Sequence, residues 1–324
     1  MKYPSYLNLS KSQWQKRIKK ALWLLERCRV CPRRCGVNRL KNQRGFCQVG
    51  RTATISSFGP HFGEERCLIG THGSGTIFMT FCNLRCIYCQ NYEISQLGHG
   101  YEISSEKLAQ AMAYLQKLGC HNINFVTPSH QVPQILEALP KAVELGLKIP
   151  LVYNTSVYDS VETLKLLSGI FDIYMPDTKY SDDRLALKYS QAPNYYKIMK
   201  KAISEMHHQV KDLKLKISRC FGRDPDFTSE KNEKVKITKR GVEGLAYRGL
   251  LIRHLVLPKN IAGTEKIMKF LASLSKNTFL NIMDQYRPCH KAYAFPPLDR
   301  QITSEEYLKA VEIAKKVGIK RIYI

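Results

Sequence analysis

Short apolar runs alternate with amphipathic segments from about residue 75 to the end of the sequence. The apolar runs predict buried strands at 75–81, 122–127, 149–154, 171–175, 249–257, 278–283 and 321–324. Between them, apolar residues at helical spacing predict helices at 104–118, 131–145, 159–168, 262–275 and 303–317. Strands that alternate with helices in this way indicate βαβ units and parallel pairing. We therefore expect an α/β fold, a partial (βα)6-type TIM barrel over residues 67–324, with functional residues at the carboxyl ends of its strands.

Two segments do not follow this alternation of strands and helices. Residues 1–66 combine an amphipathic helix over 11–27, with Trp14 and Leu25 on its apolar face, and a Cys-rich stretch over 28–47 that is too irregular for long elements. Residues 211–247 are charged and rich in lysine, and the alternation in "VKITK" is typical of a mobile hairpin. We interpret this second segment as an insertion into the barrel, either functional or a solvated decoration.

The amino-acid composition limits the class of protein, its compartment and its partners. The 324 residues are 44% hydrophobic, which excludes a disordered chain, and no apolar run approaches the roughly 20 residues of a membrane span. The apolar run at 21–25 is too short for a signal peptide, so we expect a cytoplasmic protein with reduced cysteines and no membrane contact. The net charge of +24 fits a nucleic acid or an acidic protein as partner, or simply a lysine-rich surface.

The first predicted strand leads directly into Cys82, Cys86 and Cys89, spaced C-x3-C-x2-C. A structural zinc site usually takes two pairs of ligands, and a ferredoxin run has a fourth cysteine nearby and a different spacing. Neither pattern fits, and unrelated surface cysteines are rarely so close together. A [4Fe–4S] cluster held by three thiolates remains, and its fourth iron would be open for chemistry.

This motif after the first strand of a (βα) barrel resembles the radical S-adenosylmethionine (SAM) superfamily. Blocks such as "PHFGEE", "GCHNINFVTPSH", "VYNTS", "DIYMPDTKY" and "GLLIRHLVLP" look like one branch of the pyruvate formate-lyase activating enzyme-like proteins, whose substrates are generally unassigned. The resemblance implies that SAM binds the open iron through its amino and carboxylate groups. The reduced cluster then cleaves SAM to methionine and a 5′-deoxyadenosyl radical, which abstracts a hydrogen atom from the substrate.

The same resemblance suggests residues around SAM. Activating enzymes carry a Gly-Gly-Glu motif after the second strand, but this chain has Thr127-Pro128-Ser129-His130 there, so Thr127, Ser129 or backbone carbonyls would hold the SAM amino group. Asp177 and Lys179 match an Asp-x-Lys of activating enzymes, with Lys179 near the SAM carboxylate. The remaining matched positions are Tyr88 against the adenine, Asn154 and Thr155 flanking SAM, and His254, which could equally be a core histidine.

A second cysteine set, C-x2-C-x3-C-x11-C, comprises Cys28, Cys31, Cys35 and Cys47. Four thiolates can close a metal site, so this pattern predicts a structural zinc or an auxiliary iron–sulfur cluster. The pyruvate formate-lyase activating enzyme itself lacks this segment, and the resemblance gives it no role.

Three functions follow as hypotheses. The first is an oxidoreductase that activates a glycyl-radical enzyme-like protein and takes its electron from a low-potential donor. The second is a radical SAM enzyme that modifies RNA, which the positive charge would help to bind. The third is an iron–sulfur sensor that binds nucleic acid or protein without turning over SAM.

Overall fold

A computed structural model of the 324-residue chain describes residues 2–216, 237–238, 241–242 and 244–323. Its centre is a sheet in the order β12-β11-β10-β6-β5-β4-β2-β1-β3, with β7 paired to β10. The strands are β1 (Ala53–His61), β2 (Ser74–Met79), β3 (Tyr101–Ile103), β4 (Ile123–Val126), β5 (Leu151–Thr155), β6 (Ile173–Thr178), β7 (Lys214–Lys216), β10 (Leu245–Leu255), β11 (Phe279–Met283) and β12 (Arg321–Tyr323).

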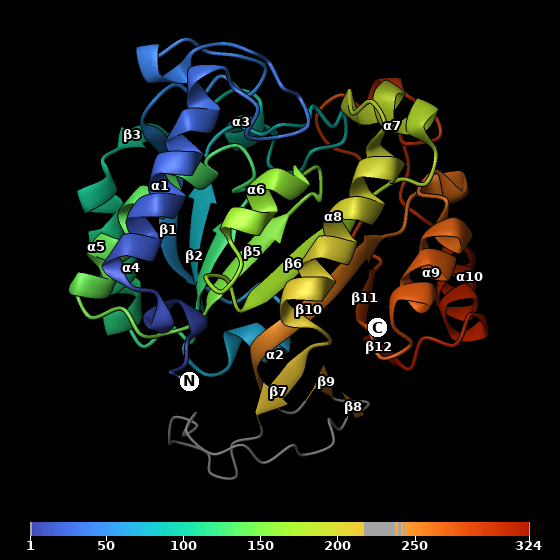
Figure 1. The fold of residues 1–324 in the computed structure, drawn as a ribbon. Helices are drawn as coiled ribbons and strands as arrows, with labels where there is room; N and C mark the ends of the chain where they lie inside the picture. Colours follow the sequence, from blue (N-terminus) through green and yellow to red (C-terminus); the bar gives the residue numbers. More distant parts are fainter. Residues whose placement is uncertain (1, 217–236, 239–240, 243, 324) are drawn as a thin grey trace.

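Along the order β2-β4-β5-β6-β10-β11-β12, neighbouring strands are parallel. Strand β1 pairs antiparallel to β2 and β3, and β7 pairs antiparallel to β10. Because β12 and β3 end the series without pairing to each other, the sheet curves but does not close. The helices lie outside it (Figure 1). They are α1 (Lys11–Glu26), α2 (Arg66–Ile69), α3 (Tyr92–Ser95), α4 (Ser105–Lys117), α5 (Val132–Glu144), α6 (Val161–Leu166), α7 (Asp183–Ser190), α8 (Tyr195–Val210), α9 (Thr264–Leu274) and α10 (Ser304–Lys316). This confirms the α/β class and the partial barrel.

Local signals explain where the helices begin. The Ser104 side chain accepts a hydrogen bond from the Lys107 backbone N–H at the start of α4, and α10 begins with a capping box between Thr303 and Glu306. The predicted helices and strands all form, with ends shifted by at most four residues. No helix in the described part of the chain has the length and apolar character needed to cross a membrane.

Several elements were missed from the sequence. Strand β1 joins the sheet from within the N-terminal segment, and α7 and α8 fill the stretch after β6. For α8 a signal was present, since Tyr195, Met199, Ala202, Ile203 and Met206 are buried at helical spacing. Within the proposed 211–247 insertion, strand β7 pairs antiparallel with the start of β10. Its short strands β8 (Ile237–Thr238) and β9 (Gly241–Val242) pair antiparallel, whereas residues 217–236, 239–240 and 243 lie outside the described residues.

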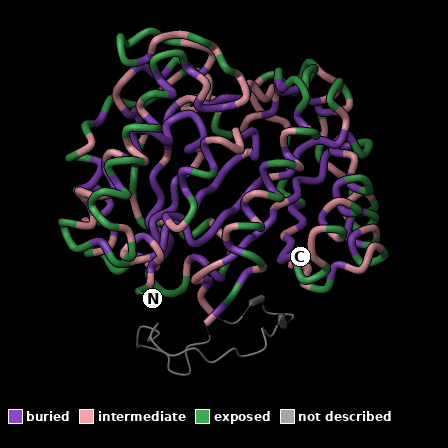
Figure 2. The backbone as a smooth tube through the Cα atoms, in the orientation of Figure 1, coloured by how far each residue is buried: buried purple, intermediate pink, exposed green. Residues whose placement is uncertain are grey.

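The buried residues follow the strands and the inward faces of the helices (Figure 2). An aromatic cluster lies at their centre, where Phe171 packs edge-to-face on Phe125 and Tyr153 at centroid distances of 5.9 and 5.1 Å. The N-terminal helix α1 packs against α5 and α6, with Trp14 and Leu25 buried as predicted. The Cys-rich segment that follows α1 lies at the carboxyl ends of the parallel strands (Figure 1).

Gly249 provides a test of the packing between β10 and the residues before β7. Its φ is +123°, and an added Cβ would lie 2.4 Å from the Leu213 Cα atom and 2.5 Å from the Asp212 carbonyl oxygen. We expect Gly249→Ala to lower the free energy of unfolding by about 3 kcal/mol, because backbone strain and overpacking add together. Gly169, at φ +71° with open space around its Cβ position, is the matched control, and Gly169→Ala should lower it by only about 1 kcal/mol. Equal losses in denaturant titrations of the two variants would contradict this account.

Candidate active site at the carboxyl ends of the strands

The loop after β2 carries the three cysteines of the C-x3-C-x2-C run. Each sulfur has a hydrogen-bonding neighbour. The Leu84 backbone N–H lies 3.3 Å from Cys82 Sγ, which also lies 3.9 Å from Asn83 Oδ1. The Ser190 hydroxyl lies 3.0 Å from Cys86 Sγ, and Ser95 Oγ lies 3.1 Å from Cys89 Sγ. The backbone N–H groups of Arg85 and Ile87 donate to the carbonyls of Ser190 and Tyr189, which ties the loop to the end of α7. The loop is therefore wrapped into a fixed shape, with all three thiols free.

The thiols lie close enough to influence one another. Burial raises the pKa of Cys82 to about 12, with contributions from Cys86 and Cys89. Burial also raises the pKa of Cys86 to about 11, and Lys179 opposes this shift. Such thiols are protonated at neutral pH unless a metal binds, and binding would release their protons.

These residues fit a [4Fe–4S] cluster better than a single ion. Within the described ranges, no three or more His, Cys, Asp or Glu side chains are grouped so as to hold a metal ion. In a cubane each thiolate binds a different iron, so its sulfurs stand farther apart than the ligands of one ion. Hydroxyl and N–H donors to the sulfurs are also what iron–sulfur thiolates require.

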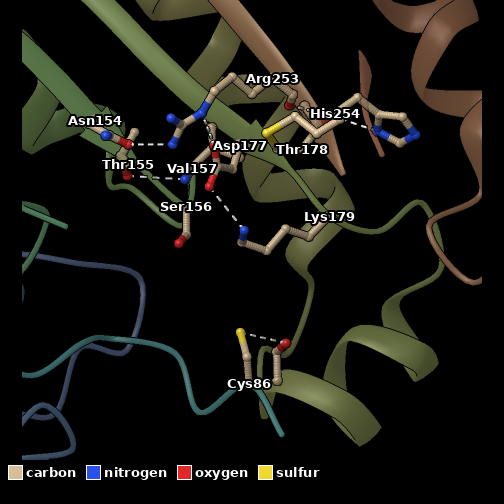
Figure 3. A network of polar contacts seen from close by, with 12 residues as sticks. Cys86, Asn154, Thr155, Ser156, Val157, Asp177, Thr178, Lys179, Arg253 and His254 are labelled. Carbon is tan, nitrogen blue, oxygen red and sulfur yellow. Dashed lines mark hydrogen bonds and ion pairs between the residues drawn. The ribbon is translucent and has the colours of Figure 1, made fainter. Parts of the chain in front are cut away.

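A buried ion network lies above this loop, centred on Asp177 at the end of β6 (Figure 3). Arg253 of β10 donates from Nε to Asp177 Oδ1 at 2.6 Å, and Lys179 donates from Nζ to Asp177 Oδ2 at 3.1 Å. The register aligns Arg253 with Asp177 on one side and with Asn281 of β11 on the other. The two cations therefore bind the two different oxygens of the same carboxylate.

The charges in this network hold one another ionised. Burial alone would raise the pKa of Asp177, but Arg253 and Lys179 outweigh it, and the pKa falls below its usual value. Burial alone would lower the pKa of Lys179, but Asp177 and Cys86 raise it above its usual value. Lys179 is therefore a buried ammonium that interacts with both Asp177 and the cluster loop.

Arg253 and two glutamates were missed from the sequence. The guanidinium also donates to Asn154 Oδ1 at 2.7 Å and to Glu64 Oε2 at 3.1 Å, and its Nη1 lies 4.0 Å from Glu65 Oε2. Both glutamates follow β1. The available signals were the arginine inside the apolar strand "GLLIRHLVL" and the paired acids in "PHFGEE".

The structure favours Arg253 over its neighbour His254 as a site residue. Both His254 ring nitrogens are engaged, Nδ1 by Thr178 Oγ1 and Nε2 by Thr264 Oγ1, each at 3.0 Å. The imidazole is fully buried between β6 and α9, and burial lowers its pKa to about 4. His254 is thus a neutral, satisfied core residue, and a role toward SAM stays a prediction without support from this geometry.

The residues after β4 and β5 form a second polar group. Ser129 Oγ lies 2.9 Å from Thr155 Oγ1, which donates to Asp159 Oδ2 at 2.7 Å. Thr127 has φ +60°, a conformation that is rare for a β-branched residue and is typical of functional sites. The predicted positions Thr127, Ser129, Asn154 and Thr155 therefore lie at neighbouring strand ends.

Tyr88, the residue before Cys89, is buried. Its ring packs edge-to-face on Tyr180 and Tyr286, at centroid distances of 6.4 and 5.8 Å. In the described part of the chain its hydroxyl has no hydrogen-bond partner. Contact of Tyr88 with an adenine stays a prediction.

This chain is similar in sequence to known proteins. The family model described as "Radical SAM superfamily" matches residues 76–218. The "Uncharacterized protein MJ0674" of Methanocaldococcus jannaschii is 32% identical over 307 residues, which cover 93% of this chain and 78% of that protein.

Solved structures show weaker similarity. "HydG: A maturase of the [FeFe]-hydrogenase" aligns with a TM-score of 0.45 and 10% identity over 74% of this chain and 47% of that one. "Native anSMEcpe with bound AdoMet" aligns with a TM-score of 0.46 and 11% identity over 73% of this chain and 57% of that one. This chain therefore spans about half the length of these two proteins.

The ion network predicts a large effect of removing its arginine. Arg253→Met leaves three buried carboxylates without their shared cation, so we expect a loss of about 3–5 kcal/mol in the free energy of unfolding. The matched control is Arg184→Met, which removes an arginine that pairs with Asp182 but has a 92% exposed side chain. The control should leave the denaturation midpoint unchanged. Similar midpoints for the Arg253 variant and the wild type would show that the network is not a stabilising unit.

Proposed function

Because this chain belongs to the radical SAM superfamily, we propose that it removes a hydrogen atom from a partner polypeptide at the site formed by Cys82, Cys86, Cys89, Asp177 and Lys179. Membership implies a [4Fe–4S] cluster and SAM. When bound, the reduced cluster supplies the electron that splits SAM into methionine and a 5′-deoxyadenosyl radical. The remaining tasks, which are to bind, orient and shield SAM, belong to the residues of this chain.

The position of Lys179 carries this proposal. Its ammonium interacts with Asp177 and with Cys86, so a buried positive charge lies beside the loop that would hold the cluster. The carboxylate of SAM needs such a counter-charge in a site with little water. Asp177 keeps the lysine ionised against the like charge of Arg253, and its hydrogen bond limits the motion of the lysine.

We assign the SAM amino group to Thr127 in preference to Ser129. The Ser129 hydroxyl is already engaged with Thr155, whereas the half-buried Thr127 is held in a strained conformation at the position of the family's Gly-Gly-Glu motif. Asn154, whose side-chain Oδ1 accepts a hydrogen bond from Arg253, would flank SAM on the neighbouring strand.

For the substrate we propose a backbone glycine of an acidic loop, as in glycyl-radical activation. The support is the Asp177–Lys179 pair, which matches the Asp-x-Lys of activating enzymes, and the net charge of +24, which attracts acidic partners. An electron from a low-potential donor protein completes the reaction.

RNA modification is the second candidate, and the location of the charge favours it. Residues 1–51 contain 14 Lys or Arg and a single acidic residue, Glu26, and therefore carry a net +13 of the total +24. Several of these cations are exposed near the strand ends, including Arg34, Lys41 and Arg44. Phosphate contacts could use such a surface.

Two variants test the SAM site. After anaerobic reconstitution with iron and sulfide, dithionite and SAM should produce 5′-deoxyadenosine in the wild type and in the Cys120→Ala control, but not in Cys86→Ala. Lys179→Gln should raise the SAM concentration for half-maximal cleavage at least tenfold, because a charge-assisted contact is lost. The exposed Lys117→Gln should not change it. A loaded, reduced wild-type cluster that leaves SAM intact would refute the enzyme assignment.

A labelled substrate distinguishes the two candidate functions. The reduced enzyme with SAM is given either a synthetic glycyl-radical loop peptide with dideuterated glycine or bulk RNA. Deuterium in the 5′-deoxyadenosine from the peptide supports glycine activation. Stimulation of SAM cleavage by RNA, with no deuterium transfer from the peptide, contradicts it. Absence of any glycyl-radical enzyme from the source genome would also weigh against glycine activation.

A further inference from the structure

The four N-terminal cysteines come together in space. A short ladder joins Cys28 to the segment after Cys35, with hydrogen bonds from the Cys28 N–H to the Val37 carbonyl at 2.8 Å and from the Gly36 N–H to the Cys28 carbonyl at 3.0 Å. Gly45 lets the chain before Cys47 pass close to Cys35, since a Cβ there would lie 3.0 Å from Cys35 Sγ. All four thiols are free, and three of them are buried.

The thiols share one environment. The Cys31 thiol interacts electrostatically with the thiols of Cys47, Cys28 and Cys35, and the Cys47 thiol interacts with those of Cys28 and Cys35.

The buried side chain of Arg39 independently indicates negative charge beside these four cysteines. Its side chain is 1% exposed, and it donates from Nε to the Gly50 carbonyl at 3.1 Å and from Nη1 to the His130 carbonyl at 2.7 Å. Its Nη1 also lies 3.9 Å from Cys28 Sγ, and its Nη2 has no hydrogen-bond partner in the described part of the chain. No ion pair between described residues involves Arg39.

A buried guanidinium without a counter-ion costs several kcal/mol. Four protonated thiols would not remove that cost, because they carry no charge. Thiolates bound to metal would remove it, since a metal site with four thiolate ligands is anionic overall.

The second cysteine set also contacts the loop of the first. Arg33 donates from Nε to the Asn83 carbonyl at 2.9 Å, between Cys82 and Cys86, and its guanidinium stacks on Phe46 at 3.7 Å from the ring centroid. Arg85, in that loop, donates to the Phe46 carbonyl at 2.8 Å. The Arg33 charge also interacts with Cys31 and Cys35 of one set and with Cys82 of the other. Arg33 therefore lies between the two sets.

We propose that Cys28, Cys31, Cys35 and Cys47 bind a second iron–sulfur cluster, closed by four thiolates and seated against the loop of the first. A single zinc ion holds its sulfurs at about 2.3 Å from one centre. The described cysteines are not grouped in that way in either set. Structural zinc sites also usually offer two close ligand pairs, whereas this set has a single C-x2-C. The inference goes beyond the proposed function and does not depend on the substrate.

Metal analysis of the reconstituted full chain tests the site. We expect about eight iron and eight sulfide per wild-type chain, corresponding to two cubanes, and about four of each in both the double variant Cys31→Ala/Cys35→Ala and Cys86→Ala. The double variant is used because three thiolates can still hold a cubane. Cys120→Ala, which changes a buried cysteine outside both sets, should match the wild type. Arg39→Gln, which keeps hydrogen bonding but removes the charge, should shift the signal of the cluster that the double variant removes.

The outcomes separate this inference from the proposed function. Unchanged iron in the double variant Cys31→Ala/Cys35→Ala, or the loss of one zinc per chain from it, would overturn the second cluster while leaving SAM cleavage untouched. If this double variant does not fold, electron paramagnetic resonance of the reduced wild type decides. Two signals, of which SAM perturbs only one, support the inference, and a single signal that SAM perturbs entirely contradicts it.

Discussion

The Asp177 carboxylate is the interaction on which the site depends. It is largely shielded from water at the end of β6, where an unpaired charge would be unfavourable, and it stays ionised because Arg253 and Lys179 bind its two oxygens. Asp177 in turn keeps Lys179 charged beside the cluster loop. Arg253 then reaches Asn154 on β5 and Glu64 after β1. One carboxylate thus links several strand ends to the residues that would bind SAM.

The two cysteine sets show how the same ligand type can serve different purposes. Cys82, Cys86 and Cys89 lie on one loop, and as three thiolate ligands they would leave an iron available to SAM. Cys28, Cys31, Cys35 and Cys47 number four, with a buried arginine beside them and a shared arginine between the sets. The N-terminal segment therefore covers the strand ends and also contacts the loop of Cys82, Cys86 and Cys89 directly through its side chains.

The strands, most helices and the loop with its three closely spaced cysteines could be predicted from the sequence, because their signals are local. Apolar runs, caps and close cysteine spacing need no knowledge of the rest of the fold. The ion network could not be predicted in this way, since Glu64 and Arg253 meet across 189 residues. In "GLLIRHLVL" the strand is buried on both faces, so no alternation reveals that Arg253 joins the site while His254 packs against α9. The positive φ of Thr127 likewise depends on tertiary structure, as threonine does not favour it.

The central claim is that SAM binds the iron left open by the three cysteines, with its carboxylate near Lys179. Electron–nuclear double resonance on the reduced cluster, with SAM labelled by 15N at the amino group and 17O at the carboxylate, tests it most directly. The account predicts hyperfine coupling from both labels to the cluster, and a changed carboxylate coupling in Lys179→Gln. A reduced, SAM-saturated cluster that shows no coupling to either label would contradict it.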